Sequence, residues 1–157
     1  MTDTVFALAT PPGRGAIAIL RLSGPATDTA LTGLGAPGLT PRTASLRTLI
    51  HEGQTLDQAL VLRFPAPRSY TGEDCAELHL HGGRAVVEAV SSALIDFGLR
   101  PAEPGEFTRR AIENGRMDEN IASMKPEEIM KTWTSFGVQA QEQFRRLMEA
   151  AVPGAKP

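Results

Sequence analysis

Apolar residues recur along the chain with two different spacings, and glycine and proline residues mark the breaks between the segments. Runs of branched or alternating apolar residues predict strands, whereas apolar residues three and four positions apart predict helices. The predicted strands are residues 5–9, 16–22, 44–51, 55–64 and 75–81, with an extended segment at 100–102; the predicted helices begin at 23–25, 83 and 106 and end near 33–35, 97 and 114. Hairpins mixed with helices indicate an α+β fold, a mixed sheet with flanking helices. The pattern does not define the order of the strands.

A separate apolar stripe runs through the C-terminal part of the chain. Its members are spaced four and three residues apart and are Ile129, Trp133, Phe136, Ala140, Phe144, Leu147 and Ala151. Pro126 with two following acids begins the segment, and acids in a first turn favour a helix. Gly137 weakens the helix by about 1 kcal/mol. We therefore expect a C-terminal amphipathic helix, whose apolar face has to be buried against something.

Composition narrows the class of protein. A length of 157 residues fits one domain, or one domain with an appendage. With 16 basic and 18 acidic residues, the net charge of −2 does not favour binding of nucleic acid through bulk charge. A small cluster of Arg109, Arg110 and Arg116 could still contact RNA. The single Cys75 excludes an internal disulfide and suits a reducing compartment. Without a signal-like start or a long apolar run, the expected location is cytoplasmic, with no membrane span.

The densest group of candidate functional residues is the run 69–74 (SYTGED) with the strand 75–81 that follows it. Alternation places Ala76, Leu78 and Leu80 on one face of this strand, and Cys75, Glu77, His79 and His81 on the other. A half-buried strand with a polar second face is expected. So many acids and histidines are unfavourable in a strand unless a ligand or a basic partner uses them.

Two kinds of chemistry fit the polar face of this strand. The Glu77 carboxylate can accept paired hydrogen bonds from an amidine-like edge, such as the 2-amino group and ring N–H of a pterin. A salt-bridged strand residue explains Glu77 equally well. His79 and His81 could bind a metal, but two histidines and one acid are not a specific signature, and imidazoles with ordinary partners are the better interpretation. Cys75 has no activating base nearby in sequence and is interpreted as a small buried residue.

Other candidates are weaker when taken alone. The loop 10–15 (TPPGRG) offers glycines and Arg14 to a ligand, although a tight connection between two strands explains it better. Arg21 and Arg116 could each meet an anionic ligand group. Arg109 and Arg110 are interpreted as a solvated helix face. The sequence contains no Gly-x-x-x-x-Gly-Lys-Ser/Thr motif, so P-loop hydrolysis of GTP or ATP is not expected of these residues.

Several of these segments together carry a family resemblance. In chain order they are residues 9–15, 19–24, 64–67, 69–74, 77–78, 81–83, 104–110 and 114–118. As an ordered set, over residues 3–118, they resemble the amino-terminal domain of the tRNA-modification GTPase family MnmE, also called TrmE. The resemblance implies an α+β module related to the folate-binding domains of one-carbon enzymes, which binds a tetrahydrofolate derivative (a 5-formyl or 5,10-methylene form) and forms a homodimer.

The resemblance also implies particular residues and partners. The family's folate-contacting positions fall on Arg21, Glu77 and Arg116, of which the last is usually lysine in relatives. In the family the folate supplies a carbon for the wobble uridine of tRNA, in a complex with MnmG, a protein that carries FAD. GTP, potassium and magnesium are expected only for the full-length family, because this chain lacks the residues that would bind them. The chain is therefore not expected to be catalytic alone, and no catalytic residue is assigned.

The resemblance ends at Asp118. Residues 119–157 do not match the family, and the segment 141–146 (QEQFRR) weakly resembles the end of a small, uncharacterised bacterial protein. We therefore divide the chain into a folate-binding domain, 1–118, and a helical tail of different origin, 119–157. The leading hypothesis is a folate-binding, dimer-forming domain without the GTPase part. The alternatives are an interaction module whose tail helix binds a partner or a second copy, and a relic fusion product.

Overall fold

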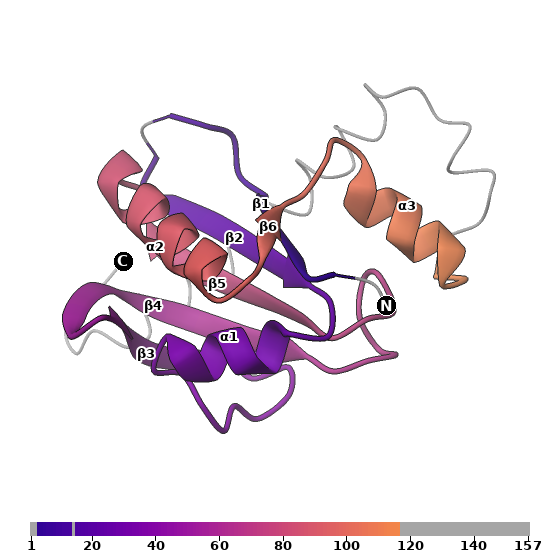
Figure 1. Ribbon diagram of the computed structural model, residues 1–157, viewed down its shortest axis with the longest axis horizontal. Coiled ribbons are helices and arrows are strands. Elements are labelled where there is room, and N and C mark those ends of the chain that lie inside the picture. Colours follow the sequence, from indigo (N-terminus) through magenta and orange to yellow (C-terminus); the bar gives the residue numbers. More distant parts are fainter. Residues whose placement is uncertain (1–2, 14, 117–157) are drawn as a thin grey trace, which may run out of the picture. The chain divides into compact units, whose positions relative to one another are not determined.

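The computed structural model describes residues 3–13 and 15–116, which form a six-stranded sheet and three helices (Figure 1). In chain order the elements are β1 (Val5–Leu8), β2 (Ile17–Ser23), α1 (Thr27–Gly33), β3 (Ser45–His51), β4 (Gln54–Phe64), β5 (Cys75–His81), α2 (Arg84–Asp96), β6 (Arg100–Pro101) and α3 (Glu106–Glu113). Each element predicted within this part of the chain is present, and the α+β class is confirmed. The predicted tail helix lies outside the described residues.

The sheet has the strand order β3-β4-β5-β2-β1-β6. All neighbouring strands are antiparallel except β1 and β6, which are parallel, so the sheet is mixed. Strand β5 lies between β2 and β4, although forty or more residues separate it from β2 in the sequence. This non-local pairing sets Arg21 directly opposite Glu77.

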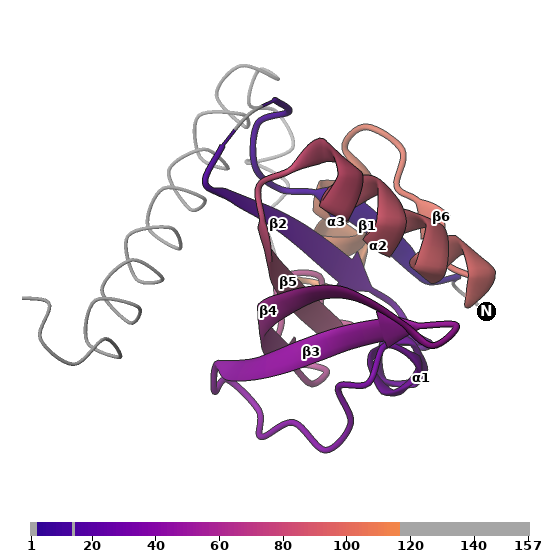
Figure 2. The ribbon, with the colours of Figure 1, turned by 90° about the vertical axis from the view of Figure 1, so that its left-hand side faces the viewer.

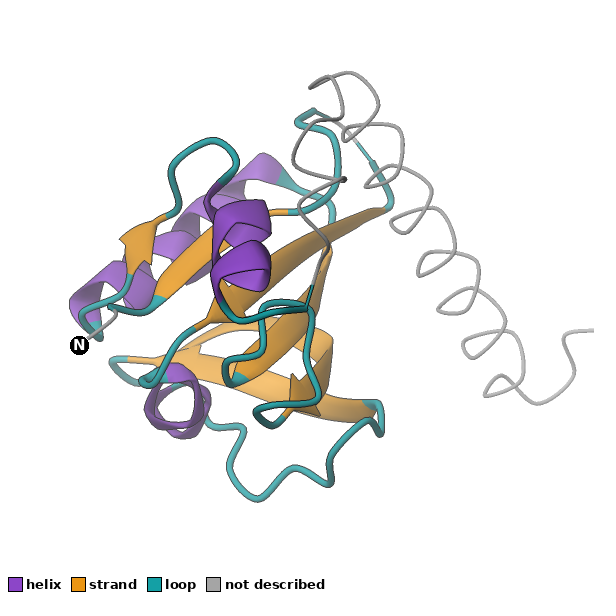
Figure 3. Ribbon diagram, turned by 90° about the vertical axis from the view of Figure 1, so that its right-hand side faces the viewer, coloured by secondary structure: helices purple, strands orange, loops and turns teal. Residues whose placement is uncertain are grey.

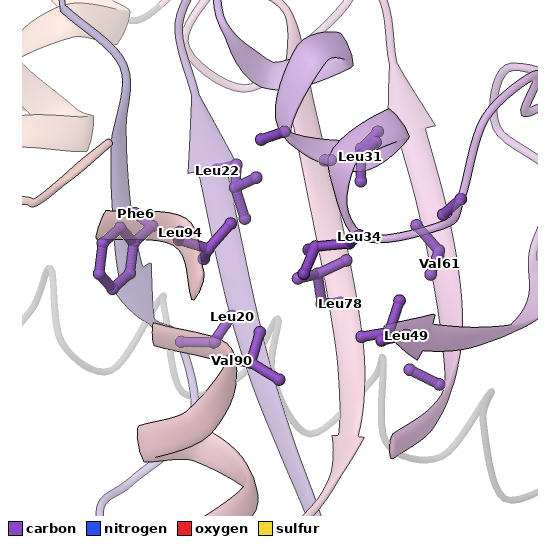
Figure 4. Packing of buried hydrophobic residues seen from close by; sticks show 14 of the residues in the cluster. Phe6, Leu20, Leu22, Leu31, Leu34, Leu49, Val61, Leu78, Val90 and Leu94 are labelled. Carbon is purple, nitrogen blue, oxygen red and sulfur yellow. The ribbon is translucent and has the colours of Figure 1, made fainter. Parts of the chain in front are cut away.

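One face of the sheet carries the hydrophobic core. Helices α1 and α2 lie on the same side of the strands (Figure 2), and their leucines pack on residues of β2, β4 and β5 (Figure 4). Fully buried members of this cluster include Leu20, Leu22, Leu34, Val61, Leu78, Val90 and Leu94. Burying one such side chain contributes roughly 1.5–3 kcal/mol relative to leaving it in water. This core stabilises the sheet and thereby holds in place the strands that carry the polar residues of the opposite face.

The second face of β5 is more buried than the alternation predicted. Cys75 is only 3% exposed and His79 only 6%, whereas Glu77 is partly exposed at 14% and His81 is exposed. The reason is that β5 is a central strand and the loop before it folds back onto it. In that loop the Thr71 hydroxyl lies 3.2 Å from the Cys75 sulfur. Cys75 is a small buried residue, as predicted.

Helix α3 is attached by ion pairs rather than by apolar packing alone, which corrects the interpretation of Arg110 as solvated. The Arg110 side chain is 3% exposed and lies 2.8 Å from Glu106 and 3.0 Å from Glu73. It also donates to the backbone carbonyl of Asp3. Arg109, by contrast, is exposed as predicted. No helix in the described part of the chain is long and apolar enough to cross a bilayer.

Candidate functional site

Arg21 and Glu77 face each other across the β2–β5 ladder, on the side of the sheet away from α1 and α2. The Nη2 atom of Arg21 lies 3.5 Å from the Oε2 atom of Glu77, and the two side chains are 15% and 14% exposed. The separation exceeds the 2.7–2.9 Å or so of a tight charge-assisted hydrogen bond. The pair is thus close enough to neutralise charge, but it leaves room for further hydrogen bonds.

The Glu77 carboxylate is charged and incompletely hydrogen-bonded. Burial would raise its pKa, but the neighbouring His79 and Arg21 side chains outweigh burial and hold the pKa of Glu77 below its usual value. Its Oε2 atom is buried and accepts no hydrogen bond within the described residues: Arg21 Nη2 lies 3.5 Å away and His79 Nε2 lies 3.8 Å away. An unmet buried acceptor costs roughly 1–3 kcal/mol. A ligand N–H donated to Oε2 would remove that cost.

Tyr70 completes this part of the site, and the sequence argument assigned it no role. The guanidinium carbon of Arg21 lies 5.8 Å from the centre of the Tyr70 ring, within the range of a cation–π contact. Burial raises the pKa of the Tyr70 phenol, and a hydrogen bond with Thr108 and the charge of Arg21 act in the opposite direction. The sequence offered one indication of a role for Tyr70, because this residue belongs to the 69–74 run of candidate functional residues.

Arg116 lies against the same loop, at the end of the described chain. Its Nε donates to the Ser69 carbonyl at 3.2 Å, and Asn114 donates to the Thr71 carbonyl at 2.8 Å. Gly72, at a φ of 82°, permits this approach, because a Cβ there would lie 3.2 Å from Arg116 Cγ. The structure therefore joins Arg21 and Glu77 directly, whereas Arg116 is connected to them through residues 69–72. Figure 3 shows the domain from the side on which α3 lies in Figure 1.

The other acids of the run are used inside the protein. Glu73 Oε2 accepts hydrogen bonds from the Ser23 hydroxyl at 2.6 Å and from Arg110 at 3.0 Å. Asp74 Oδ1 accepts from the backbone N–H of Ala66 at 2.8 Å. The basic partner anticipated from the sequence is thus Arg110 of the same chain for Glu73. Among these three acids, as the structure describes them, Glu77 has a buried oxygen without a donor.

The histidines of β5 do not assemble a metal site with Glu77. His81 is exposed, and its Nδ1 lies 2.7 Å from Asp57, whereas His79 is buried beside Glu77. Among the described residues, His51, Glu52 and Asp96 are the group of three such side chains close enough to share an ion. The interpretation of both histidines as imidazoles with ordinary partners stays a prediction, which the contact of His81 with Asp57 supports.

The loop 10–15 is described except for residue 14. The Thr10 hydroxyl accepts a hydrogen bond from the backbone N–H of Ile19 at 3.2 Å, and the end of the loop packs against Gly82, between β5 and α2. Gly82 is required there, because a Cβ would lie 1.8 Å from the Gly15 carbonyl oxygen. This close packing favours the interpretation of the loop as a tight connection.

The sequence of the chain matches known proteins over the part that carries the sheet and the Arg21–Glu77 pair. Residues 4–116 match the family model described as the N-terminus of the GTP-binding protein TrmE. The chain belongs to this family. The TrmE-type domain is also similar to proteins named tRNA modification GTPase MnmE, with 59% identity over 118 residues in Caulobacter vibrioides, 59% over 119 residues in Phenylobacterium zucineum and 56% over 117 residues in Granulibacter bethesdensis.

These matches cover different shares of the two chains. They include 74–75% of this chain but only 26–27% of each MnmE relative, so the chain spans about a quarter of the length of those relatives. A second family model, described as a family of unknown function (DUF6489), matches residues 108–156 and thus overlaps the end of the TrmE-type domain.

Proposed function

We propose that the TrmE-type domain binds a tetrahydrofolate derivative through the pterin edge and serves tRNA wobble-uridine modification of the MnmE type. One observation carries the proposal: a buried, charged carboxylate, that of Glu77, has an oxygen without a hydrogen-bond donor among the described residues. The names of the relatives support the tRNA-modification context.

The residues present fit such a ligand. The 2-amino group and ring N–H of a pterin form a two-donor edge, and an ionised carboxylate is its natural acceptor. Glu77 holds and orients that edge, while Arg21 keeps Glu77 ionised and offers donors to pterin oxygen. Arg116, exposed beside the 69–72 loop, attracts the anionic part of the ligand. When bound, the folate supplies the one-carbon unit.

Glu77 can be tested directly by calorimetry. We expect the purified chain to bind 5-formyltetrahydrofolate in the micromolar range, and Glu77→Gln to weaken binding at least tenfold, or about 1.4 kcal/mol. Glu113→Gln is the matched control, because Glu113 is an exposed glutamate of α3. If both variants bind folate as tightly as the parent does, Glu77 does not accept hydrogen bonds from the pterin edge. If the folded parent does not bind, the folate proposal fails.

We further propose that the chain forms a homodimer and that GTP hydrolysis and the MnmG-type FAD protein belong to a larger assembly. These 157 residues contain no P-loop, so we assign them no hydrolysis. On the face away from the helices, Leu46 is 61% exposed and pairs across strands with half-buried Leu60. Sedimentation velocity tests this: Leu46→Lys should shift the dimer to monomer, while Ile95→Lys, at an exposed site on α2, should not.

A second candidate function is an interaction module that uses the tail. It is favoured by the match of residues 108–156 to a different family from that of residues 4–116. Trp133→Ser and Phe144→Ser would remove apolar side chains from the predicted stripe. If these changes alter the oligomeric state or partner binding while folate affinity is unchanged, the tail has its own function. If they alter nothing, this candidate is excluded.

A further inference from the structure

Three potential metal ligands converge where the β3–β4 hairpin meets the end of α2. His51 is the last residue of β3, Glu52 begins the hairpin turn, and Asp96 is the last residue of α2. Their ligand atoms all lie within 4.8 Å of one another. His51 Nε2 is 2.9 Å from Asp96 Oδ2 and 3.9 Å from Glu52 Oε1. Two adjacent residues of the hairpin and one distant residue of α2 thus place one imidazole and two carboxylates close together.

We propose that these three side chains bind one divalent transition-metal ion of the zinc type. Tetrahedral zinc is bound at about 2.0–2.2 Å by nitrogen and oxygen ligands, which places neighbouring ligand atoms about 3.3 Å apart. The observed separations of 2.9 and 3.9 Å lie on either side of that value. Three protein ligands leave a fourth position for water, as in open zinc sites. An imidazole with carboxylates suits zinc better than calcium or magnesium, which prefer oxygen ligands alone.

The imidazole is held in place by packing. The His51 ring meets the Phe97 ring edge-on, with centroids 5.2 Å apart and planes at 79°. Phe97 in turn packs so closely on α1 that a Cβ on Gly33 would lie 2.7 Å from its ring. His51 is 18% exposed, whereas Glu52 and Asp96 are 81% and 58% exposed and can rotate toward an ion. One fixed ligand and two adjustable ligands form a partly preorganised site.

One local feature of the site favours a bound cation. Asp96 places a negative charge at the C-terminal end of α2, where the helix dipole is also negative, and the last turn contains no basic residue. A cation bound there would offset this charge and would connect the hairpin turn, through Glu52, to the end of α2.

The test uses the full-length, tag-free chain after metal removal, titrated with Zn²⁺. The chain has three histidines, so imidazole NMR resonances report on each separately. We expect one equivalent of Zn²⁺ to shift the His51 resonances while those of His79 and His81 stay in place. At a Zn²⁺ concentration about 100 times the dissociation constant, the midpoint of thermal unfolding should rise by roughly 5 °C.

Matched variants separate a specific site from surface binding. His51→Gln and Asp96→Asn should weaken Zn²⁺ binding by at least the roughly 10–100-fold that loss of an outer-shell partner costs. His81→Gln and Glu88→Gln remove an exposed imidazole and an exposed carboxylate elsewhere, and should leave binding unchanged. If Zn²⁺ does not bind, or if binding survives in His51→Gln (an adventitious ion only), the proposal is wrong. Neither result affects the folate proposal, because the ligands are different.

Discussion

Two glutamates of the same domain, the buried Glu106 and the partly buried Glu77, contact arginine in opposite ways. Glu106 accepts two hydrogen bonds from Arg100, at 2.8 and 2.7 Å, and two from Arg110, at 2.8 and 3.3 Å. The backbone N–H of Glu103 adds a further hydrogen bond at 2.9 Å. Glu77 has one arginine at 3.5 Å and one oxygen without a donor among the described residues. The first carboxylate is saturated by its own chain, and the second is not.

The contrast separates a structural role from a binding role. A saturated carboxylate has no capacity for a ligand. Arg110, which donates to Glu106, also donates to Asp3 and so joins α3 to the N-terminal segment. An unsaturated one reduces stability unless something else donates to it. Substitution of the first should therefore affect folding, and substitution of the second should affect binding.

The largest expected effect is the loss of the saturated carboxylate. Glu106→Gln removes one of the carboxylates that compensate Arg110, which is 3% exposed and also contacts Glu73 and Asp3. Breaking one side of such a buried pair costs about 3–5 kcal/mol. Urea unfolding measures this change, with Glu113→Gln as the control on the exposed face of the same helix. A loss under about 1 kcal/mol would show that the network around Glu106 is dispensable, and the comparison would not hold.

Acid titration gives the next largest effect. The hydrogen bonds from Arg100, opposed by burial, lower the pKa of Glu106 from 4.5 to about 2. Because the pKa is lower in the folded state, this stabilisation is complete above pH 4.5 and is lost as the pH falls toward 2. A shift of that size corresponds to about 3 kcal/mol. The free energy of unfolding should fall across this window in the parent and less in Glu106→Gln. Parallel curves for the two proteins would contradict the assignment.

The unsaturated carboxylate should give the reverse result. Glu77→Gln keeps the shape and supplies an amide, and Arg21 retains its contact with Tyr70, so we expect stability to fall by only about 1 kcal/mol. Folate affinity should fall at least tenfold. Urea unfolding and calorimetry on the same sample measure both quantities. A loss of stability as large as that of Glu106→Gln would make Glu77 a structural residue.

Sequence reasoning succeeded where information was local. The periods of apolar residues predicted each element of the described part, and the alternation along 75–81 placed Glu77 on the face opposite the core. The resemblance named Arg21 and Glu77, and the structure brings them together. The order of strands was not predictable, because the pairing of β2 with β5 depends on residues more than fifty positions apart.

The errors arose from long-range partners. Arg110 reads as a surface residue within its own helix, since nothing nearby in sequence shows that Asp3, 107 residues away, and Glu73, 37 residues away, surround it. The burial of His79 follows in the same way from the central position of β5 in the sheet. Tyr70 was overlooked because its ring contacts Arg21 of a different strand.

The smallest expected change in stability comes from substitution of Tyr70. Its ring contacts Arg21 and has no counterpart among the contacts described for Arg110. Arg110 is held by carboxylates and carbonyls, whereas Arg21 has the Tyr70 ring at 5.8 Å and the Glu77 carboxylate at 3.5 Å. Tyr70→Leu should reduce stability by about 0.5–1 kcal/mol through the lost cation–π contact. It should also weaken folate binding a few-fold, because Arg21 becomes less ordered beside Glu77. Tyr70→Phe keeps the ring and should retain most of the affinity. If Phe and Leu weaken binding equally, the phenol hydroxyl rather than the ring supports the site.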